Sequence, residues 1–131
     1  MNEETGGWRT ADVDDLLRAL LQLETEGEAA AFLRDLCTLG ELHDLAQRWA
    51  VVRLLDAGLH YAAIARRTGA STATITRIAS WLHHGEGGYR LALARARAAD
   101  ARAARPGEPG PDAASGAVTI GRATPSGRAA R

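Results

Sequence analysis

Residues 61–82 read YAAIARRTGASTATITRIASWL, and this stretch decides the fold of the chain. Ala65, Gly69 and Ile75 stand at the three positions that a helix-turn-helix unit constrains. A small side chain lets the two helices approach closely, and glycine takes a left-handed turn without steric cost. The β-branched isoleucine then anchors the second helix to the first. We predict two short helices joined by three or four residues around Gly69.

The second of these helices, over about residues 71–82, is expected to have one buried and one exposed face. Ser71 precedes it as a helix cap. Its apolar residues recur at helical spacing and are Ile75, Ile78, Ala79 and Leu82. The opposite face is short and uncharged at its tip, with arginine at one edge. Such a face fits a DNA major groove, where methyl groups contact thymine, hydroxyls bond base edges and arginine binds guanine or phosphate.

The predicted DNA contacts divide between base edges and phosphates. Thr72, Ala73, Thr76 and Arg77 are expected to read bases, while Arg66, Arg67 and Ser80 bind phosphates. An ordinary helical hairpin with a solvated face is the alternative. It would not need alanine, glycine and isoleucine at these offsets, and no Asp or Glu occurs from Leu59 to Gly85. The predicted contact residues are Arg66, Arg67, Ser71, Thr72, Ala73, Thr76, Arg77 and Ser80.

The charge distribution agrees with a polyanionic partner. The net charge of the 131 residues is zero, but residues 1–56 hold 5 Arg against 12 Asp and Glu. Residues 57–131 hold 11 Arg against 4 acidic residues. All 16 basic residues are Arg, which biased codon usage explains, but such bias does not explain the split. The second half is therefore expected to present a basic surface.

The remaining sequence predicts an all-α protein of about six helices. Helical spacing of apolar residues and capping patterns, with Asp12 or Thr10, Thr25 and Thr38 as caps, place three helices before Gly58. Residues 83–88 are expected to form a loop, and residues 89–104 a last helix rich in Ala and Arg. We expect a flexible segment over 1–9, one helical domain over 10–104 and a disordered Pro- and Gly-containing tail over 105–131.

Two groups of residues resemble the tryptophan-repressor superfamily. The string GASTATITR at 69–77 closely matches the turn and recognition helix of the tryptophan repressor. The strings FLRDLCT at 32–38, QRW at 47–49 and GGY at 87–89 resemble its YerC/YecD branch. The resemblance covers roughly residues 16–93. It implies an interwoven all-α homodimer that presents two recognition helices to successive major grooves, about 34 Å apart.

The resemblance also implies a pocket for a corepressor between the long helix and the recognition helix. Arg48, Thr74 and Arg77 match the residues that hold tryptophan in the repressor. Ile78 and Trp81 replace the Gly and Ser of that protein and would put bulk into the indole slot. We therefore predict that no tryptophan corepressor and no other cofactor binds. The possible effector pocket comprises Arg48, Thr74, Arg77 and Trp81.

These observations predict a sequence-specific DNA-binding transcriptional regulator, of repressor type and homodimeric, whose partner is double-stranded DNA. A helical adapter that docks an acidic protein is the alternative, and an enzyme is disfavoured because no nucleophile, base and orienting group come together. The single Cys37 and the adjacent His83 and His84 do not form a metal-ligand pattern. No apolar run is long enough for a membrane helix. We expect a cytoplasmic, nucleoid-associated protein without membrane contact.

Overall fold

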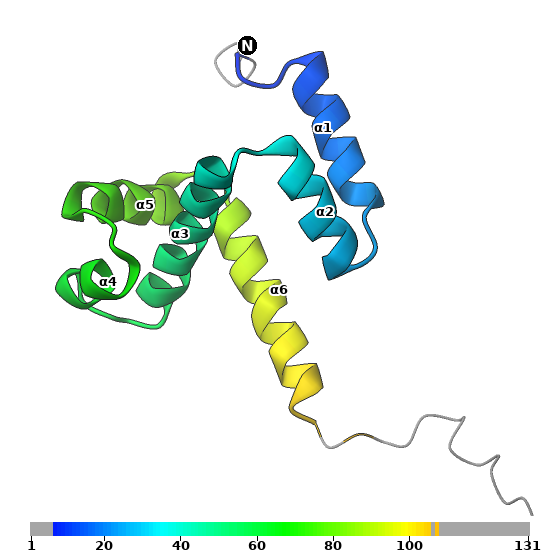
Figure 1. Cartoon of the computed structure of the whole chain (residues 1–131). Coiled ribbons are helices and arrows are strands. Elements are labelled where there is room, and N and C mark those ends of the chain that lie inside the picture. Colours follow the sequence, from blue (N-terminus) through cyan, green and yellow to red (C-terminus); the bar gives the residue numbers. More distant parts are fainter. Residues whose placement is uncertain (1–6, 106, 108–131) are drawn as a thin grey trace, which may run out of the picture. The chain divides into compact units, whose positions relative to one another are not determined.

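The computed structural model describes residues 7–105 and 107, and within them the chain forms six α-helices and no strand (Figure 1). The predicted all-α class is confirmed. Residues 1–6 of the expected flexible start and nearly all of the expected disordered tail lie outside the described residues, whereas residues 7–9 are described. Internal contacts divide the chain into two units, which meet between Leu93 and Ala94. The helices are α1 (Ala11–Gln22), α2 (Glu26–Leu36), α3 (Leu39–Asp56), α4 (Tyr61–Thr68), α5 (Thr72–His84) and α6 (Gly88–Ala103).

The first three helices begin at threonine caps that the sequence predicted. Thr10, rather than Asp12, caps α1, and its hydroxyl accepts the Val13 N–H at 3.3 Å. Thr25 and Thr38 each form a complete capping box. The threonine hydroxyl accepts the backbone N–H of the glutamate three residues later, and the carboxylate of that glutamate accepts the backbone N–H of the threonine. These caps satisfy amide groups that a helix start leaves without partners, which fixes where the helices begin.

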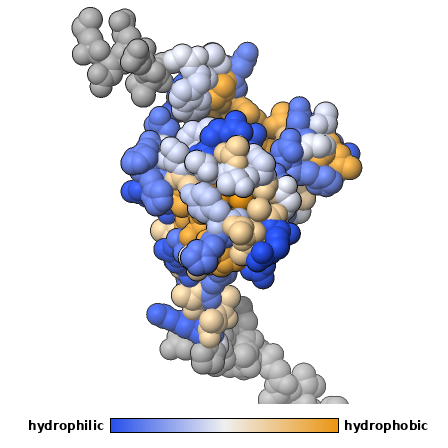
Figure 2. Space-filling view, turned by 90° about the vertical axis from the view of Figure 1, so that its left-hand side faces the viewer, coloured by the Kyte–Doolittle hydropathy of each residue, from blue (hydrophilic) through white to orange (hydrophobic). Residues whose placement is uncertain are grey.

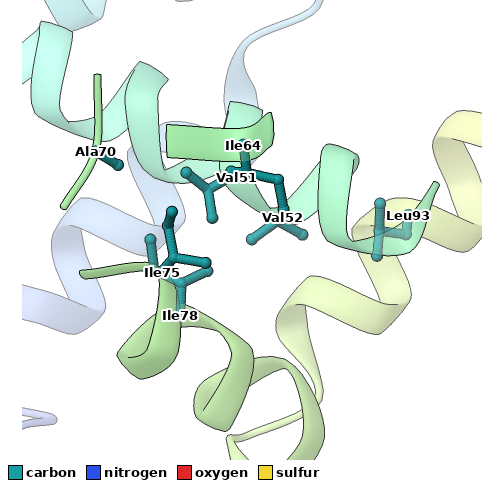
Figure 3. Packing of buried hydrophobic residues seen from close by; sticks show 7 residues of the cluster. All are labelled: Val51, Val52, Ile64, Ala70, Ile75, Ile78 and Leu93. Atoms are coloured by element: carbon teal, nitrogen blue, oxygen red, sulfur yellow. The ribbon is translucent and has the colours of Figure 1, made fainter. Parts of the chain in front are cut away.

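The core lies where α3, α4 and α5 pack together, with one residue of α6 (Figure 3). The side chains of Val51 and Val52 from α3 meet Ile64 from α4 and Ile75 from α5, and all four are fully buried. By contrast, α1 and α2 contain no buried residue. The helix-turn-helix segment is thus the best-packed part of the first unit. The core cluster comprises Val51, Val52, Ile64, Ala70, Ile75, Ile78 and Leu93.

Helix α5 extends two residues further than the sequence predicted, so the expected loop over 83–88 is wrong at its start. The helix ends at His84, and the Gly85 N–H donates to the Trp81 carbonyl at 2.8 Å. A Cβ atom at Gly85 would overlap that carbonyl oxygen. The Arg90 guanidinium donates to the carbonyls of Leu82 and His83 at 3.0 and 2.9 Å. These bonds satisfy the last carbonyls of α5 and allow the extra half turn.

Gly69 is the one residue of the turn whose backbone requires glycine. Its φ is +73°, and its N–H donates to the Ala65 carbonyl at 2.9 Å, which ends α4. Replacing Gly69 with Ala should lower the free energy of unfolding by about 1–2 kcal/mol, the cost of a left-handed conformation for an L-residue. Urea unfolding at a fixed protein concentration measures this change.

Gly40 in α3 is the matched control for this substitution. A Cβ atom at Gly40 would have no neighbour within 4 Å, and the residue is helical. Gly40→Ala should therefore raise the free energy of unfolding by about 0.5–1 kcal/mol. If Gly69→Ala also stabilises the protein, the turn does not have the left-handed geometry described.

Candidate nucleic-acid interface

The turn between α4 and α5 is fastened to α3 by a polar side chain. The Gln47 amide donates to the Thr68 carbonyl at 2.9 Å. Thr68 in turn donates its hydroxyl to the Ile64 carbonyl at 2.7 Å and accepts the Ala70 N–H at 3.2 Å. These bonds satisfy backbone groups of a partly buried turn, which would otherwise be left without partners. They hold the start of α5 at a fixed position on the core.

The outer face of α5 is exposed, and its inner face forms part of the core. Ile75 and Ile78 are 0% and 1% exposed, respectively, and Ala79 is also buried. Figure 2 views the molecule from the side on which α4 and α5 lie in Figure 1, and that face shows hydrophilic and near-neutral areas with smaller apolar patches between them. All the predicted contact residues are exposed: Arg66, Arg67, Ser71, Thr72, Ala73, Thr76, Arg77 and Ser80.

Two hydroxyls of this face already make bonds within the helix. Ser71 caps α5 by accepting the Thr74 N–H at 3.1 Å, and its hydroxyl also lies 3.0 Å from that of Thr74. Thr76 donates its hydroxyl to the Thr72 carbonyl at 2.9 Å. In this rotamer the Thr76 oxygen is left as an acceptor for an amino group of adenine or cytosine. Within the described residues the Thr72 hydroxyl has no hydrogen-bond partner, so it can donate to or accept from a base.

Three exposed arginines surround this hydroxyl-bearing face. Arg66 and Arg67 lie in the last turn of α4, and Arg77 lies in the middle of α5. Within residues 7–105, none of the three has a hydrogen-bond or ion-pair partner. An arginine fork without a carboxylate partner is well suited to a phosphate or the edge of a guanine. The local surface is therefore cationic, with neutral groups between the charges.

A small cavity opens between α3 and α5. It has a volume of about 110 Å³ and is lined by Arg48, Thr74, Arg77, Ile78 and Trp81. The structure thus brings together the four residues of the possible effector pocket. Ile78 is buried, whereas half of the Trp81 side chain is exposed. For comparison, an engineered cavity of about 150 Å³ takes up benzene, so this cavity is small for an indole ring.

Three residues that position the interface were not identified from the sequence. Gln47 and Thr68 are 21 residues apart, and no local pattern connects them. Arg90 lies eight residues from the Leu82 carbonyl that it binds, beyond the spacing of helical neighbours. Their partners are backbone carbonyls, which every residue carries, so the sequence offers no signal for these bonds.

The described residues contain few other candidate sites. They include no group of three or more His, Cys, Asp and Glu side chains arranged to hold a metal ion. His83 and His84 place their rings 6.3 Å apart, edge to face. None of the six helices is both long and apolar enough to cross a membrane. The surface of α4 and α5 is therefore the strongest candidate site.

Comparison with known proteins agrees with this geometry. The sequence model of the Trp repressor protein family matches residues 11–97, which is more than half of the chain. The chain belongs to the Trp repressor family. It is 42% identical over 89 residues to YerC of Bacillus subtilis, an alignment that covers 68% of this chain and 86% of YerC. The predicted resemblance to the YerC-like branch is confirmed.

Two solved structures have the same fold. A TrpR-like protein from Eubacterium eligens superposes with a TM-score of 0.65 and 39% sequence identity, and the match covers 68% of this chain and 92% of the Eubacterium eligens chain. A candidate Trp repressor from Staphylococcus aureus gives a TM-score of 0.65 and 40% sequence identity, and the match covers 68% of this chain and 89% of the Staphylococcus aureus chain. Membership of this family of DNA-binding regulators supports the assignment of α4 and α5 as a helix-turn-helix unit.

Proposed function

We propose that the protein is a sequence-specific DNA-binding transcriptional repressor whose α5 reads the major groove. The observation that carries the proposal is the outer face of α5: exposed Thr72, Ala73, Thr76 and Arg77 on a helix whose opposite face carries the buried Ile75, Ile78 and Ala79. A rigid helix with short side chains at its tip can approach base edges closely. Arg66, Arg67 and Ser80 would bind phosphates beside it. The protein would act at the nucleoid, and no catalytic step is assigned to it.

We further propose that two copies form the functional unit. Five leucines of α1, α2 and the first two turns of α3 are exposed in the single chain, with exposed fractions between 38% and 82%. Exposed apolar patches of this kind mark interaction surfaces in soluble proteins. A second copy would cover them and place a second α5 on the same duplex. The residues concerned are Leu20, Leu21, Leu36, Leu39 and Leu45.

Placing charge on this apolar surface should separate the two copies. The double substitution Leu36→Glu and Leu39→Glu puts two carboxylates on side chains that are 51% and 52% exposed in one chain. Light scattering after gel filtration should give a dimer mass for the natural sequence and a monomer mass for this variant. Ala11→Glu, at an exposed position in the first turn of α1, is the control and should stay dimeric. A dimeric double variant would contradict the proposed interface.

We propose that DNA binding requires no tryptophan. Ile78 and Trp81 line the cavity of about 110 Å³ beside Arg48 and leave too little room for an indole ring. Titration calorimetry with L-tryptophan should give no binding heat, and 1 mM L-tryptophan should leave DNA affinity unchanged. Binding in the micromolar range, or tighter DNA binding with the amino acid present, would contradict this prediction.

An adapter that docks an acidic protein is the second candidate, because the same cationic surface would suit it. The two candidates differ in selectivity. Selection of bound duplexes from a random pool should yield a palindromic consensus if a dimer reads DNA, with half-sites about one helical turn apart. An adapter would bind all duplexes weakly and would enrich no consensus, and that result would overturn the proposed function.

A further inference from the structure

A stripe of arginines follows one side of the last part of α6. Arg95, Ala98 and Arg102 are spaced at i, i+3 and i+7, which keeps them on one side of a helix with 3.6 residues per turn, and Arg105 follows two residues after α6 ends at Ala103. Asp100, the sole acidic residue between 94 and 105, falls about half a turn away from them. All residues from Ala94 to Arg105 are exposed. We call Arg95, Arg102 and Arg105 the arginine stripe.

The arginine stripe has no internal counterpart. Within residues 7–105, its three side chains make no hydrogen bond or ion pair. Arg102 and Arg105 instead line a shallow cavity of about 350 Å³ together with Ala98 and Ala101. The three positive charges repel one another, because no ion pair within residues 7–105 neutralises them, although the helix dipole favours Arg102 in the last turn of α6. A polyanion would remove this repulsion, and the small alanines would let it approach the helix backbone.

The arginine stripe also extends beyond what the family shares. The region that matches the Trp repressor family ends at residue 97, before Arg102 and Arg105. The core does not require these side chains either, because the last buried residue of α6 is Leu93. Neither the fold nor the family therefore accounts for the stripe.

We propose that the arginine stripe binds the phosphate backbone of DNA. This inference rests on the proposed DNA binding and adds a second, sequence-independent contact to it. Arginine forks bind phosphates in two-point contacts, and each phosphate neutralised releases condensed counterions. The stripe would therefore raise affinity and salt dependence but would leave base preference unchanged.

The test replaces Arg95, Arg102 and Arg105 with alanine, the residue that best preserves the helix. Binding of the full chain to a selected duplex is followed by fluorescence anisotropy over a range of salt concentrations. The slope of log K against log salt should fall in magnitude by about 0.9 for each phosphate that the variant no longer neutralises. The preferred sequence should not change. Circular dichroism should show the same helix content as for the natural chain.

The matched control removes three arginines from the acidic half of the chain, Arg9, Arg18 and Arg34. Arg9 and Arg18 form ion pairs with Asp14 and Asp15, respectively. Because three arginines are removed in each case, this variant has the same net charge as the stripe variant, but it keeps the stripe. Its salt slope should equal that of the natural sequence.

If the stripe variant also keeps the natural slope while the natural chain binds its duplex normally, the inference is overturned and the proposed function stands. Binding to polyglutamate is measured in parallel. If the stripe variant loses affinity for polyglutamate but keeps the natural affinity and salt slope for DNA, an acidic protein is the partner instead. A natural chain that binds no duplex would overturn both.

Discussion

Replacing Arg77 with alanine is expected to weaken binding to a selected duplex by about 1–3 kcal/mol in each half-site. Arg77 is exposed on the outer face of α5 and has no internal partner among the described residues. Its removal leaves an unpaired guanine edge or phosphate in the complex, while the buried face of the helix is untouched. The measurement is the dissociation constant of the full chain at fixed salt.

Thr72→Ala is the informative comparison for Arg77→Ala. Thr72 lies at the first position of α5, is exposed, and keeps a free hydroxyl. Its replacement removes a bond to a base but no charge, so it should alter which duplexes are preferred more than it lowers the overall affinity. If both variants bind the selected duplex as tightly as the natural chain, the reading face has been assigned to the wrong side of α5.

The largest effect on stability is expected from Ile75→Ala. Ile75 is fully buried where α5 meets Val51 and Ile64, so truncation leaves a cavity between three helices. Such substitutions lower the free energy of unfolding by about 2–5 kcal/mol, a large part of the stability of a small domain. Urea unfolding at constant protein concentration measures the change, because the proposed dimerisation would make stability depend on concentration.

Ile75→Val provides the graded control for this truncation. It removes one methylene group from the same buried site and should cost about 0.5–1.5 kcal/mol. The DNA-contacting face is unchanged, so the valine variant should bind DNA normally at temperatures where it is folded. If Ile75→Ala is as stable as the natural chain, α5 does not pack on the core as described.

Features set by neighbours in sequence were predicted correctly. The capping boxes at Thr25 and Thr38 each need one hydroxyl and one glutamate three residues later, and both form as expected. The offsets of Gly69 and Ile75 likewise specify a tight turn followed by a buried helix face. Such patterns act over one or two helical turns, so they can be interpreted without tertiary contacts.

Features set by distant backbone groups were not predicted. Helix α5 passes the expected end at Leu82 because Arg90 binds the carbonyls of Leu82 and His83. The turn is held by Gln47 through the Thr68 carbonyl, a contact across 21 residues. A polar side chain that binds a distant carbonyl has no characteristic partner in the sequence, so it becomes visible only once the helices are placed.

The packing partner of α1 and α2 could not be predicted from the sequence either. Their apolar residues follow helical spacing, as predicted, yet neither helix buries a residue in the single chain. Leu21 remains 82% exposed. Apolar periodicity identifies the face of a helix that becomes buried, but it does not say whether the same chain or a second copy covers that face.

The most direct test of major-groove reading uses chemically altered versions of the selected duplex. Uracil in place of thymine and 7-deazaguanine in place of guanine change groups exposed in the major groove, whereas inosine in place of guanine removes the minor-groove amino group. We expect the first two changes, at positions within the half-sites, to weaken binding by about 1–3 kcal/mol per contact, with inosine neutral. If inosine weakens binding and both major-groove changes are neutral, α5 does not read the groove assigned to it.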